Sequence, residues 1–372
     1  MTRRTPIASA AALLLATGSA FAAEPRPPRY VETLTLPTHS EGFHDWPSDE
    51  LSAIEFIPSL HGNMLNTPVS FWVMPDDRSN EAPARIGRIE SRWDAGTPVF
   101  GGIAWTALRD EYGNTFEKNT VDPEAVRFLM FNQGGGITSE TIVWTSEGYG
   151  KKGIQPAIYQ WTMSENASTR WNLPAAFLHD DAEHPTRGIF HNNGFESLAI
   201  DTWRGKPEAY AAVERPLIQD EGTGVCRVLV RPLNGGKVSQ LGYPLGPVPE
   251  GTDADTAAVA EMLCVGPRRF LVLENAELPD GETVATLWWC STDGASDLTD
   301  IDSLKDPGKA QPRFIEKKLL LDFSTLPNNE GLGNFEGVDE RDGRLYFVED
   351  NEHGKAGSTR LLVLTKPSGL EK

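Results

Sequence analysis

The chain has 372 residues, with 34 Lys and Arg against 53 Asp and Glu, which gives a formal net charge of −19. So acidic a chain does not bind nucleic acid or an anionic membrane through its overall charge, whereas metal binding, or solubility alone, would suit it. The length is large for one simple domain, but a repeated architecture can reach it without splitting.

Residues 1–22 have the features of a secretory signal peptide. Arg3 and Arg4 precede the apolar run Ala8–Ala16, and the small residues of Ala20–Ala22 form a cleavage site. The apolar run is shorter than the about 20 residues that a membrane span requires, so we expect no membrane span. The segment therefore predicts a periplasmic or secreted protein.

The first arginines also fit a twin-arginine export signal, except that Pro6 stands where that signal has a bulky apolar residue. Export leaves one predicted domain over residues 23–372. It also places Cys226, Cys264 and Cys290 in an oxidising compartment, where one disulfide with a free thiol, or three buried unpaired cysteines, are both compatible with the sequence.

A pair of strand-like segments recurs five times along the chain. The first segment of each pair carries Glu or Ser, and the second ends in a carboxylate. The pairs are LSAIEF (51–56) with FWVMPDDR (71–78), VDPEAVRF (121–128) with TIVWTSEG (141–148), NGFESLAI (193–200) with AYAAVERP (209–216), AVAEML (258–263) with RFLVLEN (269–275), and NFEGVDE (334–340) with RLYFVEDN (344–351).

The spacing of these pairs predicts an all-β β-propeller. The step from Glu124 to Glu196 is 72 residues, and a period this long, with several strands in each unit, favours a radial repeat over a solenoid. Five blades are clear, and a degenerate sixth within Pro98–Asn119 is an alternative. Two stacked β-sandwiches would explain the strands but not the repeated carboxylates.

Other apolar runs supply the third and fourth strands of the four-stranded blades. Examples are CRVLVRPL (226–233), KVSQLGYPL (237–245), TVATLWWC (283–290) and KKLLLDF (317–323). The N-terminal run YVETLTL (30–36) lacks a motif of its own. We expect it to pair beside TRLLVLT (359–365), which would close the ring and remove its open edges.

The repeated carboxylates are the candidate metal ligands, because the same strand of every blade points to one axis. An acid that ends a single strand is usually a turn residue, but five in the same frame weaken that explanation. Oxygen ligands without a His and Cys set favour Ca²⁺ or Mg²⁺, and Ca²⁺ first. The candidate ligands are Asp77, Glu124, Glu147, Glu196, Glu214, Glu274, Glu336 and Asp350.

Arg78 and Arg215 directly follow two of the acidic strand ends. Each could hold a phosphate or carboxylate group through two hydrogen bonds, or could pair with a neighbouring Glu. The sequence contains no G-x-S-x-G elbow and no H-E-x-x-H motif, so neither a serine hydrolase nor a zinc peptidase is indicated.

At these motifs the chain resembles the bacterial family described as esterase-like activity of phytase. The matching segments are DPEAV (122–126), WTSEG (144–148), RGIFHNNGFESLAI (187–200), AAVERPLIQD (211–220), FLVLEN (270–275), NFEGVDE (334–340) and VEDN (348–351). The resemblance covers the mature chain. It implies a propeller with an acidic central cleft and a phosphoester or ester hydrolase activity.

The chain departs from the family pattern at three places. Asn275 stands where the family usually has Arg after Glu, which removes one potential phosphate donor. Asp350 follows Glu349 where two aspartates are common, and Ala53 follows Ser52 where Gly is usual. These departures weaken the case for an anion site more than the case for the fold.

Two functional hypotheses follow. The first is a calcium-dependent hydrolase of a small anionic ester or phosphoester, with Glu196 and Glu336 as ligands or general base and with Arg78 and Arg215 binding the anion. The second is a non-catalytic periplasmic propeller in which calcium is structural and the propeller face binds a ligand or protein. In both cases we expect a monomer that binds no nucleic acid.

Overall fold

The computed structural model describes residues 26–369 apart from 38–39, 42–45, 49, 58–68, 95–96, 133–137, 181, 204, 309–310 and 352–357. The predicted signal peptide lies outside the described residues and stays a prediction. The described helices are 3₁₀ turns of three residues each, so none of them could cross a membrane. They are η1 (Gly150–Lys152), η2 (Ile218–Asp220), η3 (Ala254–Thr256), η4 (Phe323–Thr325) and η5 (Pro327–Asn329).

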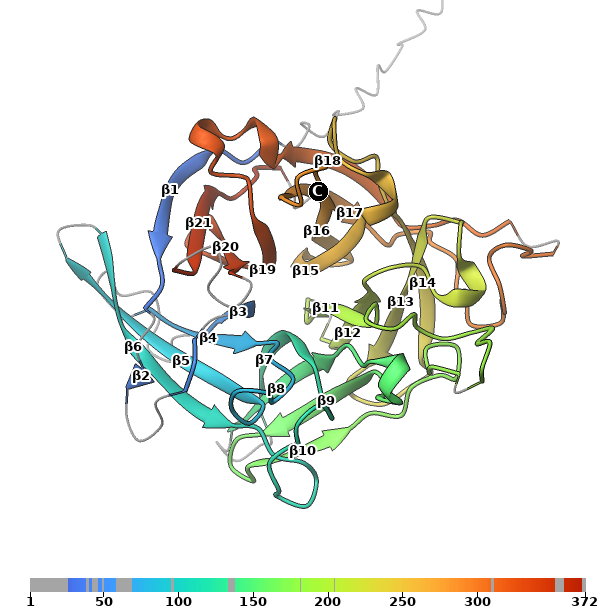
Figure 1. Ribbon diagram of the computed structural model, residues 1–372, viewed down its shortest axis with the longest axis horizontal. Helices are drawn as coiled ribbons and strands as arrows, with labels where there is room; N and C mark the ends of the chain where they lie inside the picture. Colours follow the sequence, from blue (N-terminus) through green and yellow to red (C-terminus); the bar gives the residue numbers. More distant parts are fainter. Residues whose placement is uncertain are drawn as a thin grey trace, which may run out of the picture.

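The strands form five sheets arranged as the blades of a propeller around a central axis (Figure 1). Blade 1 contains β3 (Leu51–Phe56), β4 (Val69–Pro75), β5 (Arg85–Asp94) and β6 (Thr97–Ala107), with β2 (Ser40–Glu41) added in parallel to β6. Blade 2 contains β7 (Pro123–Asn132), β8 (Thr138–Ser146), β9 (Ala157–Thr162) and β10 (Ala167–Arg170). Blade 3 contains β11 (Phe195–Asp201), β12 (Glu208–Val213), β13 (Val225–Pro232) and β14 (Ser239–Pro244).

Blade 4 contains β15 (Ala258–Gly266), β16 (Arg269–Glu277), β17 (Thr283–Ser291) and β18 (Glu316–Asp322). Blade 5 combines β19 (Asn334–Arg341), β20 (Arg344–Asp350) and β21 (Arg360–Thr365) with the N-terminal β1 (Tyr30–Thr35), which pairs antiparallel to β21. The first and last strands of the chain thus share one sheet, and this pairing closes the ring, as the sequence predicts.

The five predicted motif pairs are confirmed as the first two strands of the five blades. The alternative of a sixth blade within Pro98–Asn119 is wrong, because residues 98–107 belong to β6 and pair with β5 as the fourth strand of blade 1. Among the described cysteines no disulfide forms. Cys226 and Cys290 are buried, and Cys264 is partly buried.

The hydrophobic core lies between neighbouring sheets. One cluster joins blade 4 to blade 5 through side chains such as Leu271 and Phe347, and another joins blade 1 to blade 2 through Trp72 and Trp144. Because each blade packs on both neighbours, the ring fixes the position of every innermost strand. These strands, β3, β7, β11, β15 and β19, contact one another around the axis (Figure 1).

A buried ionic cluster, which we call the Arg127 hub, ties the innermost strands together. Arg127 of β7 is 3% exposed and lies 3.0 Å from Glu261 of β15 and 3.5 Å from Glu55 of β3. Its Nη2 also donates to the Met262 carbonyl at 2.7 Å. Asp339 of β19 is close enough to raise the pKa of Arg127, as the other two carboxylates do. Four innermost strands therefore meet at one guanidinium group.

The carboxylates of the hub also bond to neighbouring blades through the backbone. The amide of Phe128 donates to Glu55 at 2.9 Å, that of Leu198 donates to Glu261 at 3.0 Å, and that of Phe56 donates to Asp339 at 2.6 Å. Through Leu198 the hub reaches blade 3, so all five blades are connected to it. Burial is the main cause that raises the pKa of Glu261 to about 7 and that of Asp339 to about 6.

Replacing the hub cation should destabilise the whole ring. We expect Arg127→Met to lower the free energy of unfolding by about 3–5 kcal/mol, because it leaves buried carboxylates without their partner. Arg88→Met is the control, since Arg88 pairs with Glu90 at the surface and should cost less than about 1 kcal/mol. Urea unfolding followed by tryptophan fluorescence measures both. Equal midpoints for the two variants would contradict a role for the hub.

Candidate metal centre

Each innermost strand contains a β-bulge at its entry to the blade. The pairing register shifts between Leu51 and Ala53, Pro123 and Val126, Phe195 and Ser197, Val259 and Glu261, and Phe335 and Gly337. A bulge leaves an extra residue unpaired and re-aims its side chain. The equivalent bulge residues in blades 1 to 5 are Ser52, Glu124, Glu196, Ala260 and Glu336.

A second set of equivalent positions lies where the second strand of each blade ends. The amides of Asp76, Glu147 and Glu214 make the same hydrogen bond, to the carbonyls of Glu50, Asp122 and Gly194 respectively, at 2.7–3.1 Å. The corresponding pair in blade 5 is Asp350 opposite Asn334, and in blade 4 it is Asn275 opposite Ala258. Each blade thus has three equivalent positions at which acids recur, although only blade 2 has an acid at all three, and the ring brings these positions together.

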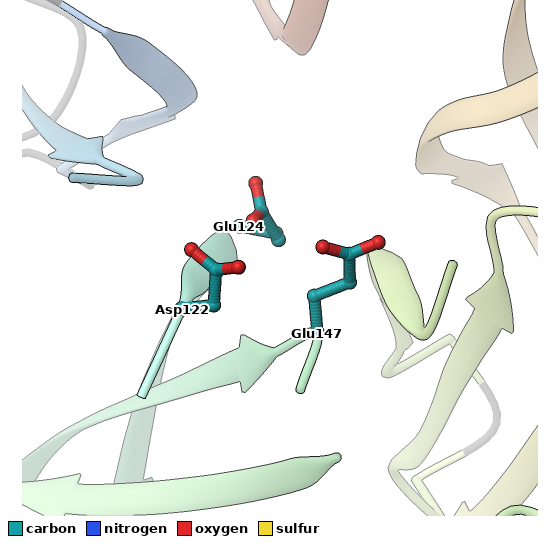
Figure 2. A group of neighbouring side chains, drawn as sticks. All are labelled: Asp122, Glu124 and Glu147. Atoms are coloured by element: carbon teal, nitrogen blue, oxygen red, sulfur yellow. The ribbon is translucent and has the colours of Figure 1, made fainter. Parts of the chain in front are cut away.

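Three overlapping groups of carboxylates result. In each group one carboxylate oxygen of every member lies within 4.8 Å of those of the other two. The groups, which we call triads, are Asp122–Glu124–Glu147, Glu124–Glu196–Glu336 and Glu147–Glu196–Glu214. Figure 2 shows the first triad, with Asp122 and Glu124 at the start of β7 and Glu147 just after β8.

The triads have the spacing and the donor atoms that a hard cation needs. Ca²⁺ binds oxygen at 2.3–2.6 Å, so two of its ligands lie at most about 5 Å apart. Any two triads share one residue, namely Glu124, Glu147 or Glu196, and carboxylates can bridge two ions through their two oxygens. The described residues could therefore hold one ion in any triad or several ions joined by shared glutamates.

Burial and mutual repulsion make the ionised carboxylates costly without a cation. Burial is the main cause that raises the pKa of Glu124 and Glu196 well above its usual range, and the neighbouring acids raise it further. Burial also raises the pKa of Asp122 to about 6, despite the lowering effect of Arg78. The Asp122 side chain is only about 1% exposed, and its Oδ1 has no hydrogen-bond partner. A buried carboxylate oxygen that accepts no hydrogen bond is available to coordinate a metal ion, which would offset the cost of its burial.

Hydrogen bonds between blades hold several of these side chains in place. Glu147 accepts a bond from the Gly194 amide at 3.2 Å. A Cβ atom at Gly194 would lie 1.8 Å from the Glu147 carbonyl oxygen, so only glycine permits this approach of blade 3 to blade 2. Asn193 donates to Glu214, and Asn334 donates to Glu336 at 2.7 Å. The carboxylates are thus positioned by the fold before any ion binds.

Of the predicted ligands, the structure brings five into the triads: Glu124, Glu147, Glu196, Glu214 and Glu336. Asp350 lies beside Glu336 and raises its pKa. Asp77 instead forms a buried ion pair with Arg85, and Glu274 bonds to Lys317 and Tyr243. Both lie one residue away from the position that is equivalent to Glu147 and Glu214. A shift of one residue turns a strand side chain to the other face.

Two acids that the sequence analysis missed occupy the positions in register. Asp122 belongs to the first triad, and Asp76 has a raised pKa because of burial and then of Glu336 and Asp350. The available signal for Asp76 was the pair Asp76-Asp77, in which the first member aligns with Glu147 and Glu214. Asp122 lies within the motif VDPEAVRF, two residues before Glu124, at a position that is acidic in only two blades.

The two predicted anion-binding arginines already have protein partners. Arg78 forms an ion pair with Asp122 at 2.6 Å and donates to Asn192 at 2.8 Å. Arg215 donates to the carbonyls of Asp255 and Thr256, both at 2.9 Å, and lies 3.4 Å from Glu214. The pairing with a neighbouring acid, which the sequence left open, is therefore present at both residues.

A cleft of about 280 Å³ opens beside the triads. Its walls include Glu196, Glu214 and Glu336 from the triads, and Ala260 from blade 4, with Arg215 at its edge. A small molecule in this cleft would reach the carboxylates of two triads. The arrangement can therefore present a bound cation to a ligand.

Comparison with protein families identifies the class of the chain. The profile described as phytase-like, esterase-like activity of phytase, matches residues 51–356, which is most of the propeller. The chain belongs to this family, as the sequence motifs indicate. A comparison with curated proteins finds no significant match.

Two solved structures are distantly similar to this chain. A hypothetical protein from Leishmania major is 10% identical with a TM-score of 0.42, and the alignment covers 92% of this chain and 93% of that one. The Dos1 propeller is 7% identical with a TM-score of 0.32, and the alignment covers 91% and 95% of the two chains. At these scores and identities neither similarity bears on the activity of this chain.

The raised pKa values predict how stability depends on pH when no cation is present. The pKa of Asp122 rises from 3.8 to about 6 on folding. Its contribution to the free energy of unfolding is therefore full below about pH 4 and is lost as the pH rises through about 6. The other triad acids have the same sign. We expect the unfolding temperature in chelator to fall as the pH rises from about 4 through about 6, and excess Ca²⁺ to remove the fall. Calorimetry with identical pH slopes in Ca²⁺ and in chelator would contradict this.

The sharing of residues between triads predicts an order of effects on cation affinity. Glu196→Gln alters two triads and Glu214→Gln alters one, so the first should weaken Ca²⁺ binding more. We expect losses of about 100-fold and about 10-fold, which correspond to about 2.7 and 1.4 kcal/mol. Glu140→Gln is the matched control, because Glu140 is an exposed residue of β8. Isothermal titration with Ca²⁺ measures the order, and equal affinities for the three variants would refute it.

Proposed function

We propose that this chain is a divalent-cation-dependent hydrolase of phosphoesters or related esters, with Ca²⁺ as its ion. The observation that carries the proposal is the opening of two carboxylate triads into a cleft that has Arg215 at its edge. A site for a structural ion needs no such opening. Membership of the family described as esterase-like activity of phytase supports the same reaction class.

The choice of Ca²⁺ rests on the donor atoms. Each triad offers carboxylate oxygens only, and no described His or Cys takes part in these groups. Oxygen-only sites suit Ca²⁺ and Mg²⁺, and Ca²⁺ tolerates irregular geometry and a variable number of ligands. When bound, the ion supplies neutralising charge to a substrate oxygen and lowers the pKa of a bound water.

The residues of the chain divide the remaining tasks. Glu196 and Glu336 line the cleft and belong to the same triad, so either could accept the proton of an attacking water. Arg215 lies at the edge of the cleft, where its charge favours an anionic substrate. Arg78 pairs with Asp122 and orients that carboxylate, so we assign it a positioning role.

The alternative is a non-catalytic propeller with structural calcium that binds a ligand or protein. Asn275 favours it, because its amide donates to Asn334 at 3.1 Å and to the Phe335 carbonyl at 3.0 Å and so joins blades 4 and 5 rather than facing an anion. In this case calcium would raise stability without turnover. We further propose, for either function, an exported monomer in the periplasm or medium. The partner of the hydrolase is a small anionic ester or phosphoester.

A hydrolysis assay separates the two functions. We expect release of p-nitrophenol from p-nitrophenyl phosphate or p-nitrophenyl acetate in excess Ca²⁺, and none in chelator. Glu196→Gln and Glu336→Gln should lower kcat by at least about 100-fold, as the loss of a general base does, whereas Glu140→Gln should not change it. Turnover that persists in chelator would exclude the mechanism, and calcium-dependent stability without turnover of any ester would favour the alternative.

A further inference from the structure

Blade 4 differs from the other blades at the axis. At the three equivalent positions it has Ala258, Ala260 and Asn275. Every other blade has an acid in at least one of them, and blade 2 has acids in all three, which are Asp122, Glu124 and Glu147. The ring of carboxylates is therefore interrupted at one blade, and the missing side chains leave space there.

The cleft beside the triads lies at this interruption. Ala258, Ala260 and Asn275 line it together with Glu196 and Glu336. Small side chains of blade 4 thus border the same space as the candidate ligands. The interruption in blade 4 gives access to the metal centre from one direction.

A second and larger hollow adjoins the cleft. It has a volume of about 560 Å³, lies over blades 3 and 4, and shares Arg215 with the cleft. We call it the outer groove. Its volume is in the range of pockets that bind organic molecules of moderate size. A ligand whose reactive group lay in the cleft could extend past Arg215 into this groove.

The lining of the outer groove disfavours negative charge. Phe190, Pro216 and Leu245 supply apolar surface, whereas Glu221 and Asp255 supply negative charge. Among the described lining residues the one cation is Arg215, and it already donates to two backbone carbonyls. An uncharged group with apolar surface would be accommodated here, and a second anionic group would be repelled by the two carboxylates.

We propose that the substrate binds across blade 4, with its anionic ester group in the cleft and its alcohol portion in the outer groove. The substrate class is a monoester of a bulky, uncharged alcohol, and an alcohol that carries further phosphates is a poor ligand. This assignment rests on the proposed function for the identity of the ester. The outer groove itself is a separate part of the surface from the triads.

Binding of non-hydrolysable phosphonates in excess Ca²⁺ tests the assignment without requiring turnover. Methylphosphonate fills the cleft alone, benzylphosphonate adds an uncharged ring, and p-xylylenediphosphonate adds a second anionic group to that ring. We expect benzylphosphonate to bind at least about tenfold more tightly than either of the other two in isothermal titration, which is about 1.4 kcal/mol. Equal or tighter binding of the diphosphonate would overturn the proposal.

A variant that fills the outer groove locates the effect. Ala254 is an exposed residue that lines the groove, so Ala254→Trp should weaken benzylphosphonate about tenfold and leave methylphosphonate within about twofold. Ser164→Trp, on an exposed turn of blade 2, is the matched control and should change neither. Unchanged benzylphosphonate binding in Ala254→Trp would refute binding of the alcohol portion in the outer groove. If the binding pattern holds but no ester is hydrolysed, the hydrolase proposal fails and the groove remains.

Discussion

Electrostatic repulsion among buried carboxyl groups at the axis is the constraint on which the rest of this structure depends. A propeller brings the same position of each blade to one line, so an acid repeated in the sequence becomes a cluster in space. Six carboxyl groups from three blades form the overlapping triads. Ionised groups at such burial need protons, cationic side chains or metal ions as partners, because burial without them costs several kcal/mol for each ion.

The innermost strands meet this constraint in different ways at two levels along their length. At the hub, Arg127 and three backbone amides bond to the carboxylates of Glu55, Glu261 and Asp339, and the result is a sealed connection between blades. The triads lie about three residues earlier along β7, or about 10 Å away. There Asp122 and Glu214 form ion pairs with Arg78 and Arg215, and a cleft opens to the surface. The Arg127 hub thus holds the blades together, whereas the triads retain unsatisfied charge.

The fold could be predicted from the sequence because the strand pairs repeat five times and each repeat carries the same apolar pattern. The details of the site could not, since they depend on register. The repeated frame placed Glu124, Glu196 and Glu336 among the predicted ligands, but the β-bulges, which set the register that points them at the axis, leave no mark in the residue pattern. In blade 1 the motif ends in two aspartates, and sequence alone does not show that Asp76 rather than Asp77 is in register. The Arg127 hub could not be predicted from the sequence, because Glu55 and Arg127 lie within apolar strand motifs and their partners come from other blades.

Anomalous diffraction would decide whether the axial triads bind divalent cations. Crystals of residues 23–372 grown with Mn²⁺ or Tb³⁺ as a substitute for Ca²⁺ would place each ion without reference to activity. We expect anomalous peaks between the carboxylates of Glu124, Glu147 and Glu196, with oxygen ligands from at least one complete triad. Peaks confined to the outer surface, with the triad carboxylates unligated at saturating ion, would show that the triads are not a metal centre.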